Sequence, residues 1–463
     1  MIQPAEIDAK AKEFDIHVVN VQRDYIFGWL LSGMYSVSSL KDILILKGGN
    51  ALRKAYFYST RFSADLDFTT ESSIDPQALM QELNTVCKYI QEKTGVVFDF
   101  DKNQIVDEQM INERKKVYKV KLYFKDFYGN QEEVVISVRV DITEFDKIYL
   151  PVQTRMLIHP YSDLEECQVE IKCIKLEEAM ADKLKCLLQR RSSFDLFDLV
   201  RTVFINNELA VDKGEIVGTF LKKTIFQASP VAAKNLLLGI PLDFFRSFWD
   251  KHIVCPKDSR IPFDSAIKAF QDGLDGLFGD HTYGQGNTLA FFPSELRNPI
   301  LRAGSEQTLL KVVYNGKERM VEPYSLAYKR RQDGVSQEYL YVYDRTDSAD
   351  RNPKSFINTN FTSLENTTEK FEPKWQVELS KAGETSGKTY FGKPFEERSR
   401  TQPRGTTSRP RRITSRIRGY GMTYTIQCSY CMKKFKRETY NTRLNKHKDS
   451  YGNLCYGRVG YQV

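Results

Sequence analysis

The feature that most restricts the fold of this chain is a pair of aspartates, Asp65 and Asp67, in the short segment DLDFTT. This segment predicts a strand over 65–70. Side chains two positions apart on a strand leave the same face, so the two carboxylates are expected side by side. Adjacent carboxylates repel each other unless a divalent cation lies between them. The pair therefore predicts a strand that carries a metal site.

Two further features extend this pattern. Gly48-Gly49 lies about 16 residues before the pair, within a strand expected over 42–50, and Asp141 ends an alternating strand expected over 132–143. Paired glycines directly before a helix offer backbone N–H groups to phosphate without Cβ atoms in the way. Carboxylates on adjacent strands beside such a turn suit Mg²⁺-dependent nucleotidyl transfer, in which the metal bridges a triphosphate.

Composition limits the class of protein. Of 463 residues, 41% are hydrophobic and 12% aromatic, which predicts two to four domains with real cores and excludes a wholly disordered or fibrous chain. No apolar run approaches the ~18 residues of a membrane span, and the N-terminus lacks the pattern of a signal peptide. Eight cysteines over this length are too few for a disulfide scaffold, so we expect thiols or metal ligands in a soluble, cytoplasmic protein without membrane segments.

Three separated motifs resemble the AbiEii/AbiGii-type family of polymerase-β-like nucleotidyltransferases, toxins of bacterial abortive-infection and toxin–antitoxin systems. In order, they are KGGNALR (47–53), RFSADLDF (61–68), and ADKL (181–184) followed by Arg190 or Arg191 and FDLFDL (194–199). The resemblance covers about residues 30–205. Asn50 replaces a small hydroxyl residue of the family, and Phe194 replaces an arginine, for which Arg190 or Arg191 substitutes.

The resemblance implies a role for each matching residue. Asp65 and Asp67 are implied to hold Mg²⁺ or Mn²⁺, with Asp141 as a third ligand. The nucleotide phosphates are contacted by Gly48, Gly49 and Ser63, Lys183 neutralises triphosphate charge, and Asp195 orients the lysine or serves near the incoming nucleophile. On the residues alone, Lys183 and Asp195 would form an ordinary charged helix face.

The pattern of hydrophobic residues predicts an α+β chain. Helices are expected over 5–36, over 76–95 and through most of 176–278, and strands also over 96–100 and 117–127. The expected division is a polymerase-β-like nucleotidyltransferase core (1–150), a helical lobe that completes the active site (151–290), a small SH3-like β module (296–375), a basic flexible linker (376–423) and a zinc-finger-like module (424–463).

The β module contains, in order, Leu310, Tyr314, Gly316 and Arg319, then Glu322-Pro323, Tyr339-Leu340 and Phe371-Glu372-Pro373. This pattern resembles the WYL domain, which senses ligands or nucleic acid in bacterial regulators and defence proteins. Asn315-Gly316 is its strongest hairpin signal. Glu338 stands where the family has its name-giving tryptophan, and Asn358 or Asn360 stands near the position of a family arginine. The alternative is a β module that only separates the two ends of the chain.

Positive charge is concentrated at the C-terminus. The net charge is +8, yet residues 376–463 contain 19 Lys+Arg and 6 Asp+Glu, so the preceding 375 residues sum to about −5. No acidic residue lies between Ser399 and Gln427. This pattern predicts either a solvated linker or an arm that binds a polyanion such as nucleic acid.

The last forty residues contain a potential zinc site. Cys428, Cys431, His447 and Cys455 provide the ligand types and spacing of one tetrahedral Zn²⁺, although unrelated thiols are the alternative. Phe435 and Leu444 match the hydrophobic pair of a C2H2-like finger, and surrounding lysines and arginines favour nucleic acid as its partner.

Together these features predict a metal-dependent nucleotidyltransferase that transfers NMP from NTP to an RNA acceptor, with a tRNA 3′ end favoured. The family resemblance implies a toxin of a phage-defence system, with an antitoxin protein as a partner. Two alternatives remain open, namely nucleotidylation of a protein and a nucleic-acid-binding regulator whose transferase fold has lost activity. The intact Asp65/Asp67 pair argues against the second alternative.

Overall fold

The structure is a computed structural model. It describes residues 2–110, 116–128, 135–205, 208–279, 290–330, 335–347, 352–385 and 388–395, and five short segments between 424 and 462. The chain divides into two compact units, Met1–Gly129 with Val135–Thr401, and Asn130–Val134 with Gln402–Val463. In the parts of the chain described, no helix is long and apolar enough to cross a membrane.

The core of the first unit is a seven-stranded mixed sheet with the order β3-β4-β5-β2-β1-β7-β6. Strand β2 runs parallel to β5 and β1 runs parallel to β7, whereas the other neighbours are antiparallel. The strands are β1 (Ile45–Lys47), β2 (Asp65–Thr70), β3 (Gln104–Met110), β4 (Lys116–Lys125), β5 (Val135–Glu144), β6 (Gln153–Met156) and β7 (Glu170–Cys173).

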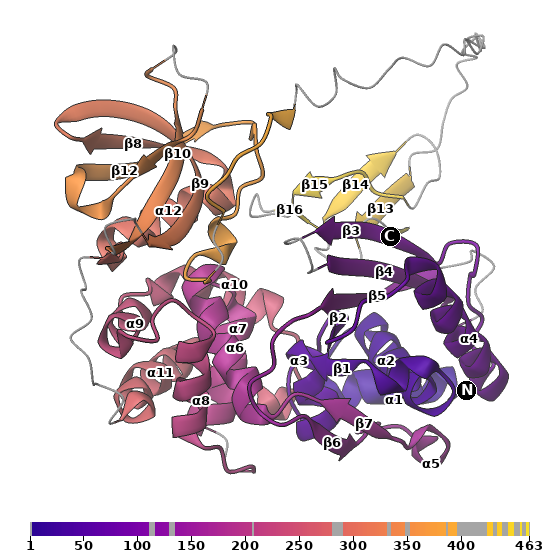
Figure 1. Cartoon of the computed structure of the whole chain (residues 1–463). Coiled ribbons are helices and arrows are strands. Elements are labelled where there is room, and N and C mark those ends of the chain that lie inside the picture. Colours follow the sequence, from indigo (N-terminus) through magenta and orange to yellow (C-terminus); the bar gives the residue numbers. More distant parts are fainter. Residues whose placement is uncertain are drawn as a thin grey trace, which may run out of the picture. The chain divides into compact units, whose positions relative to one another are not determined.

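Helices α1 (Pro4–Phe14), α2 (Val18–Ser36) and α4 (Pro76–Thr94) share one hydrophobic core with this sheet (Figure 1). Alternate residues of β2 and β5, such as Leu66, Phe68 and Val140, are buried in this core. Because the side-chain period of a strand is two, the residues between them leave the opposite face. That face carries the three aspartates.

The core differs from the sequence prediction in three places. The helix expected over 5–36 is two helices, because Asp15 adopts a left-handed conformation (φ 54°) between them. The expected strand 96–100 forms only an isolated bridge, Phe98 to Phe124, and the strand beside β4 is instead β3. The expected core boundary at residue 150 is wrong, because β6 and β7 extend the same sheet to Cys173.

A helical lobe follows the sheet and has its own hydrophobic core, which also includes Leu52 and Phe57 from the first segment of the chain. Its elements are α6 (Leu176–Gln189), α7 (Ser193–Leu199), η3 (Val200–Ile205), α8 (Lys213–Lys222), α9 (Pro230–Leu238), η4 (Leu242–Phe245), α10 (Arg246–His252), η5 (Lys257–Ser259) and α11 (Phe263–Phe278). The smaller elements of the sheet domain are η1 (Ser39–Asp42), α3 (Gly48–Ala51), η2 (Leu52–Tyr56) and α5 (Leu164–Cys167).

The β module contains α12 (Ser294–Glu306) and a five-stranded antiparallel sheet with the order β11-β10-β9-β8-β12. Its elements are β8 (Thr308–Tyr314), β9 (Lys317–Arg330), β10 (Ser336–Asp344), β11 (Lys354–Phe356), η7 (Asn358–Asn360) and β12 (Phe361–Lys370). The predicted hairpin is present, with Asn315 and Gly316 at φ 51° and 71° between β8 and β9. Glu338 is fully buried and accepts hydrogen bonds from Arg297 at 2.7 and 3.0 Å.

The basic linker was expected to begin at residue 376, but the folded β module continues past this position. Leu379, in η8 (Leu379–Lys381), and Ala382 are buried in the core of the β module, and Trp375 Nε1 donates to the Gly392 carbonyl at 2.7 Å. The described residues up to 395 therefore belong to the folded module, because apolar side chains of this segment pack into a core. The remainder of the expected linker, 396–423, lies outside the described residues.

The second unit contains a three-stranded sheet with the order β14-β13-β17 and a two-stranded ladder, β15-β16. The strands are β13 (Tyr424–Cys428), β14 (Lys434–Arg437), β15 (His447–Lys448), β16 (Leu454–Cys455) and β17 (Gly460–Gln462).

Candidate active site

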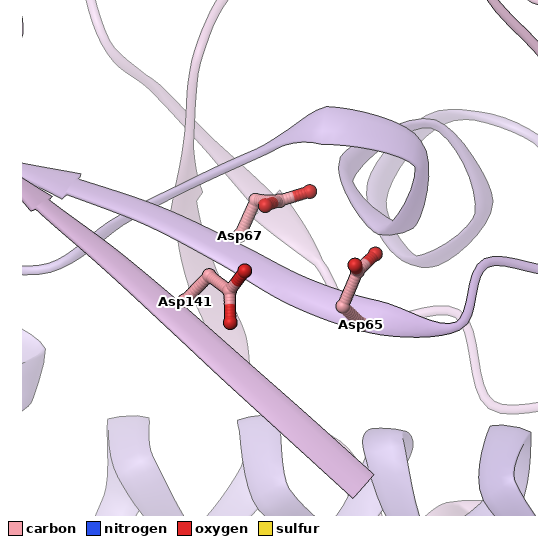
Figure 2. A group of neighbouring side chains, drawn as sticks. All are labelled: Asp65, Asp67 and Asp141. Carbon is pink, nitrogen blue, oxygen red and sulfur yellow. The ribbon is translucent and has the colours of Figure 1, made fainter. Parts of the chain in front are cut away.

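Three carboxylates meet on the open face of the core sheet (Figure 2). Asp65 and Asp67 leave the same face of β2, and the parallel register of β2 and β5 pairs Asp67 with Asp141. Carboxylate oxygens of the three residues all lie within 4.8 Å of one another. Figure 2 shows the three side chains projecting from neighbouring strands on that face. The sequence prediction of a strand pair and a third acid at the same level agrees with this geometry.

The Gly48-Gly49 turn is packed against these carboxylates. Gly48 has φ +73°, and a Cβ atom there would lie 2.2 Å from Asp67 Oδ2. A Cβ on Gly49 would lie 2.8 Å from Ser63 Oγ, and that hydroxyl donates to Asp65 Oδ1 at 3.3 Å. Both glycines are therefore required by close approach of the chain to the site. The side-chain amide of Asn50 donates to the Asp65 carbonyl at 2.5 Å.

The electrostatics of the cluster show unbalanced negative charge. Burial, reinforced by the Asp65 carboxylate, raises the pKa of Asp67 to about 7. Burial also raises the pKa of Asp141, although the Arg139 guanidinium opposes this shift. Arg139 contacts Asp65 and lies 3.7 Å from Asp141 Oδ2, so its guanidinium contributes positive charge beside the carboxylates.

These residues fit a hard divalent cation. Carboxylate oxygens are the ligands that Mg²⁺ prefers in proteins. Asp141 Oδ1 is buried and has no hydrogen-bond partner among the described residues, as expected of an atom intended for a ligand. Asp65, Asp67 and Asp141 would therefore hold Mg²⁺ or Mn²⁺.

A buried charge network lies in the lobe at the second group of predicted residues. Lys183, on α6, donates to Asp195 Oδ1 at 3.1 Å and pairs with Asp198 Oδ2 at 2.8 Å. Arg61 pairs with both oxygens of Asp198 at 2.7 Å. Burial alone would raise the pKa of Asp195, but the neighbouring charges of Lys183 and Arg190 lower it to about 2. The network therefore holds the Asp195 carboxylate ionised.

This network shows which arginine takes the place left by Phe194. Arg190 donates to both oxygens of Asp195 at 2.7 and 2.8 Å, whereas Arg191 bonds to the carbonyl and side-chain oxygens of Asn298. The Phe194 ring lies under the Arg61 guanidinium, with 4.9 Å between the guanidinium carbon and the ring centroid. Lys183 is close enough to Asp67 to oppose the rise in its pKa, which connects the network to the carboxylate cluster.

Sequence reasoning assigned no role to three residues of this site, Arg61, Arg139 and Asp198, and left the choice between Arg190 and Arg191 open. Arg61 and Asp198 belong to the motifs RFSADLDF and FDLFDL. The position of Asp198 one helical turn after Asp195 was the sequence signal that could have identified it. Arg139 had only its place in the alternating strand, two residues before Asp141.

The predicted zinc ligands are described in part. Cys428 is buried at the end of β13, and its N–H donates to the Lys433 carbonyl at 2.9 Å, closing the hairpin to β14. His447 pairs with Cys455 in the β15-β16 ladder. Cys431 lies outside the described residues, as does the side chain of Cys455.

Comparison with known proteins identifies the first part of the chain. Residues 29–225 match the family described as Nucleotidyl transferase AbiEii toxin, Type IV TA system. These residues form a nucleotidyltransferase domain. The domain includes the carboxylate cluster, the Gly-Gly turn and the Lys183 network, and it ends before the β module. The WYL resemblance, the SH3-like description and the zinc finger remain predictions.

Other comparisons add little to this assignment. Among solved structures, the chain is similar to MenT4, a nucleotidyltransferase toxin from Mycobacterium tuberculosis, at 15% identity and a TM-score of 0.37, covering 59% of this chain and 87% of that chain. A similarity this distant supports no inference about substrate. No curated protein matches the chain.

Proposed function

We propose that this nucleotidyltransferase transfers NMP from an NTP to an RNA acceptor, with a tRNA 3′ end as the favoured site, as the toxin of a toxin–antitoxin system active in phage defence. The observation that carries the activity is the triad of carboxylates within 4.8 Å of one another beside the Gly-Gly turn. The matched family supports the toxin role and an antitoxin partner.

The proposed mechanism assigns a task to each group. Mg²⁺ held at the cluster would supply charge stabilisation for an in-line displacement at the α-phosphate, in which an acceptor hydroxyl forms the new P–O bond and pyrophosphate leaves. Asp65, Asp67 and Asp141 would hold the metal, and Ser63 with the glycine turn would receive the phosphates. Lys183 offsets triphosphate charge, and Asp195, held ionised by Lys183 and Arg190, positions the lysine near the reacting end. Because lysine and carboxylate are both buried, their geometry is pre-organised.

The test of this function separates it from its alternatives. The full-length protein is incubated with Mg²⁺, each labelled NTP, total tRNA and cell lysate. We expect label in an RNase-sensitive product that EDTA abolishes. Label in a protease-sensitive product would establish nucleotidylation of a protein, and the absence of label with every NTP would favour the inactive regulator.

We also propose that Cys428, Cys431, His447 and Cys455 bind one structural Zn²⁺. Two observations support it: the hairpin closed at Cys428 and the pairing of His447 with Cys455. In addition, His447 Nδ1 lies 2.8 Å from the Asn445 carbonyl, and a donor at Nδ1 leaves the Nε2 lone pair for a metal. The basic residues around this site and in the preceding arm favour RNA as the partner.

The zinc site predicts a metal content. The purified protein should contain about one equivalent of Zn²⁺ per chain. The double variant Cys428→Ser with Cys431→Ser should lose it while nucleotidyl transfer to a concentrated acceptor persists, because the carboxylate cluster lies in the other unit. Cys186→Ser, in α6, is the matched control and should retain the zinc. Atomic absorption on the three proteins measures this, and a metal-free wild type would contradict the proposal.

A further inference from the structure

An aromatic ladder lies along one face of the helical lobe. Phe244, Phe248 and His252 are spaced four apart across η4 and α10, so their side chains share a helix face. Ring centroids are 5.4 Å apart for Phe244 and Phe248 and 5.2 Å apart for Phe248 and His252. The ladder continues to Phe194 of α7, whose ring stacks on His252 at 6.3 Å and 24°.

The ladder is not part of the lobe's core. The core side of the same segment consists of Phe245 and Trp249, which are 1% and 2% exposed. By contrast, Phe244 is 41% exposed, and the other three rings are only half-buried. The four rings do not belong to the core, and large apolar side chains in contact with water are unfavourable. Their arrangement in a row at the surface therefore needs another explanation.

One end of the ladder adjoins the catalytic cluster. The Phe194 ring lies under Arg61, and the Arg61 guanidinium lies beside Gly49 and Ser63, since a Cβ on Gly49 would be 2.6 Å from the Arg61 Nη2 atom. Ser63 in turn donates to Asp65. A polymer bound along the ladder would therefore reach the proposed metal site.

The other end of the ladder opens into a positively charged cavity. Phe244 lines a cavity of about 260 Å³ together with Arg190, Arg191 and Arg302. The side chains of Arg190 and Arg302 are 53% and 58% exposed. Arg190 Nε and Nη2 donate to Asp195 and Arg302 Nε donates to Glu306, so among the described contacts Arg190 Nη1 and the two Nη atoms of Arg302 are the donors left for a ligand. Burial, together with the positive charges of Arg297 and Arg302, lowers the pKa of Arg191 to about 10.

We propose that the aromatic ladder binds the single-stranded end of a nucleic-acid acceptor, with bases stacked on Phe244, Phe248, His252 and Phe194 and phosphates received by the arginines of the cavity. Exposed aromatic rings next to cationic side chains are the combination by which proteins hold unpaired bases without reading sequence. A duplex keeps its base faces covered, so the ladder selects an unpaired end. This proposal rests on the proposed function, because it places the acceptor strand of that reaction.

The experiment measures binding without catalysis. Fluorescence anisotropy is recorded for the full-length protein, without NTP or metal, with three probes of one length: a single-stranded RNA, its blunt duplex, and an abasic strand. Elevated salt suppresses phosphate contacts of the basic arm. The variants are Phe244→Ala with Phe248→Ala, the ring-retaining Phe248→Tyr, and Tyr390→Ala as a control whose ring is 81% exposed elsewhere.

The double alanine variant should bind the single-stranded RNA roughly ten- to a hundredfold more weakly, as expected from the loss of one or two stacked bases. Its affinity for the abasic strand and the duplex should equal that of the wild type. Phe248→Tyr and Tyr390→Ala should bind like the wild type, and all variants should keep its melting temperature. The proposal would be overturned if the double variant bound the single-stranded RNA with wild-type affinity, or if it lost as much affinity for the abasic strand.

The outcomes also separate this proposal from the proposed function. If the double variant binds and labels RNA like the wild type, the ladder is wrong and the transferase stands. If ladder-dependent binding is observed but the wild type transfers no nucleotide to any acceptor, the transferase proposal fails and the binding surface stands. A loss of duplex binding alone would overturn the assignment of a single-stranded partner.

Discussion

Asp65→Asn and Asp67→Asn should each reduce nucleotidyl transfer by at least about a thousandfold, since a bound metal supplies several kcal/mol of charge stabilisation in the transition state. The two carboxylates lie on one face of β2 and share their site with Asp141. Replacing either with a neutral amide removes a metal ligand and leaves the shape of the strand unchanged. The measurement is the initial rate of label transfer at saturating Mg²⁺.

The same variants should not unfold the protein. Burial and the Asp65 carboxylate raise the pKa of Asp67, so the folded chain without metal gains nothing from a charge at this position. The melting temperature of Asp67→Asn in EDTA should therefore equal or exceed that of the wild type. Asp264→Asn, an exposed aspartate in the first turn of α11, is the control and should keep wild-type activity. Wild-type rates in Asp65→Asn or Asp67→Asn would show that the cluster is not the active site.

Asp198→Ala should lower the free energy of unfolding by about 3–5 kcal/mol, the cost of leaving buried charges without their partner. Asp198 is 1% exposed and pairs with Arg61 through two contacts of 2.7 Å and with Lys183 at 2.8 Å. Its removal leaves an arginine without its carboxylate partner and gives Lys183 only Asp195. The measurement is urea unfolding of the full-length protein, followed by tryptophan fluorescence.

Two further variants show whether charge or lost volume causes the effect. Asp250→Ala, an exposed aspartate of α10, should change the free energy of unfolding by less than about 0.5 kcal/mol. Adding Lys183→Met to Asp198→Ala should cost less than the sum of the two single changes, because the second substitution removes a charge that the first left unpaired. Strict additivity would mean that Lys183 and Asp198 do not interact.

Sequence alone determined the parts of this site that depend on local periodicity. The period of two along a strand placed Asp65 and Asp67 on one face, and Gly48-Gly49 needed only the sharp turn and close approach that glycine permits. The Asn315-Gly316 hairpin was equally local, because both residues tolerate positive φ. These features follow from chain geometry over a few residues.

The elements that sequence reasoning missed have weak local signals. Strand β3 is polar, and β6 and β7 have four residues each, so no alternation of useful length marks them. Strand β7 is nevertheless the parallel neighbour of β1 in the core sheet. The folded segment up to residue 395 was also missed, because it was grouped with the basic residues that follow it, while its few apolar residues pack into a core.

Only the tertiary structure decided how the site is completed. The register of β2 against β5 brings Asp141 opposite Asp67, a pairing between strands about 70 residues apart in sequence. Arg190 rather than Arg191 contacts Asp195 because of where α6 ends. Arg191 follows in a left-handed conformation (φ 50°), and its side chain bonds to Asn298. Asp198 is a shared partner of Arg61 and Lys183 because the lobe packs against the segment that precedes β2. Contacts between distant segments are set by packing of the whole domain, which no local pattern encodes.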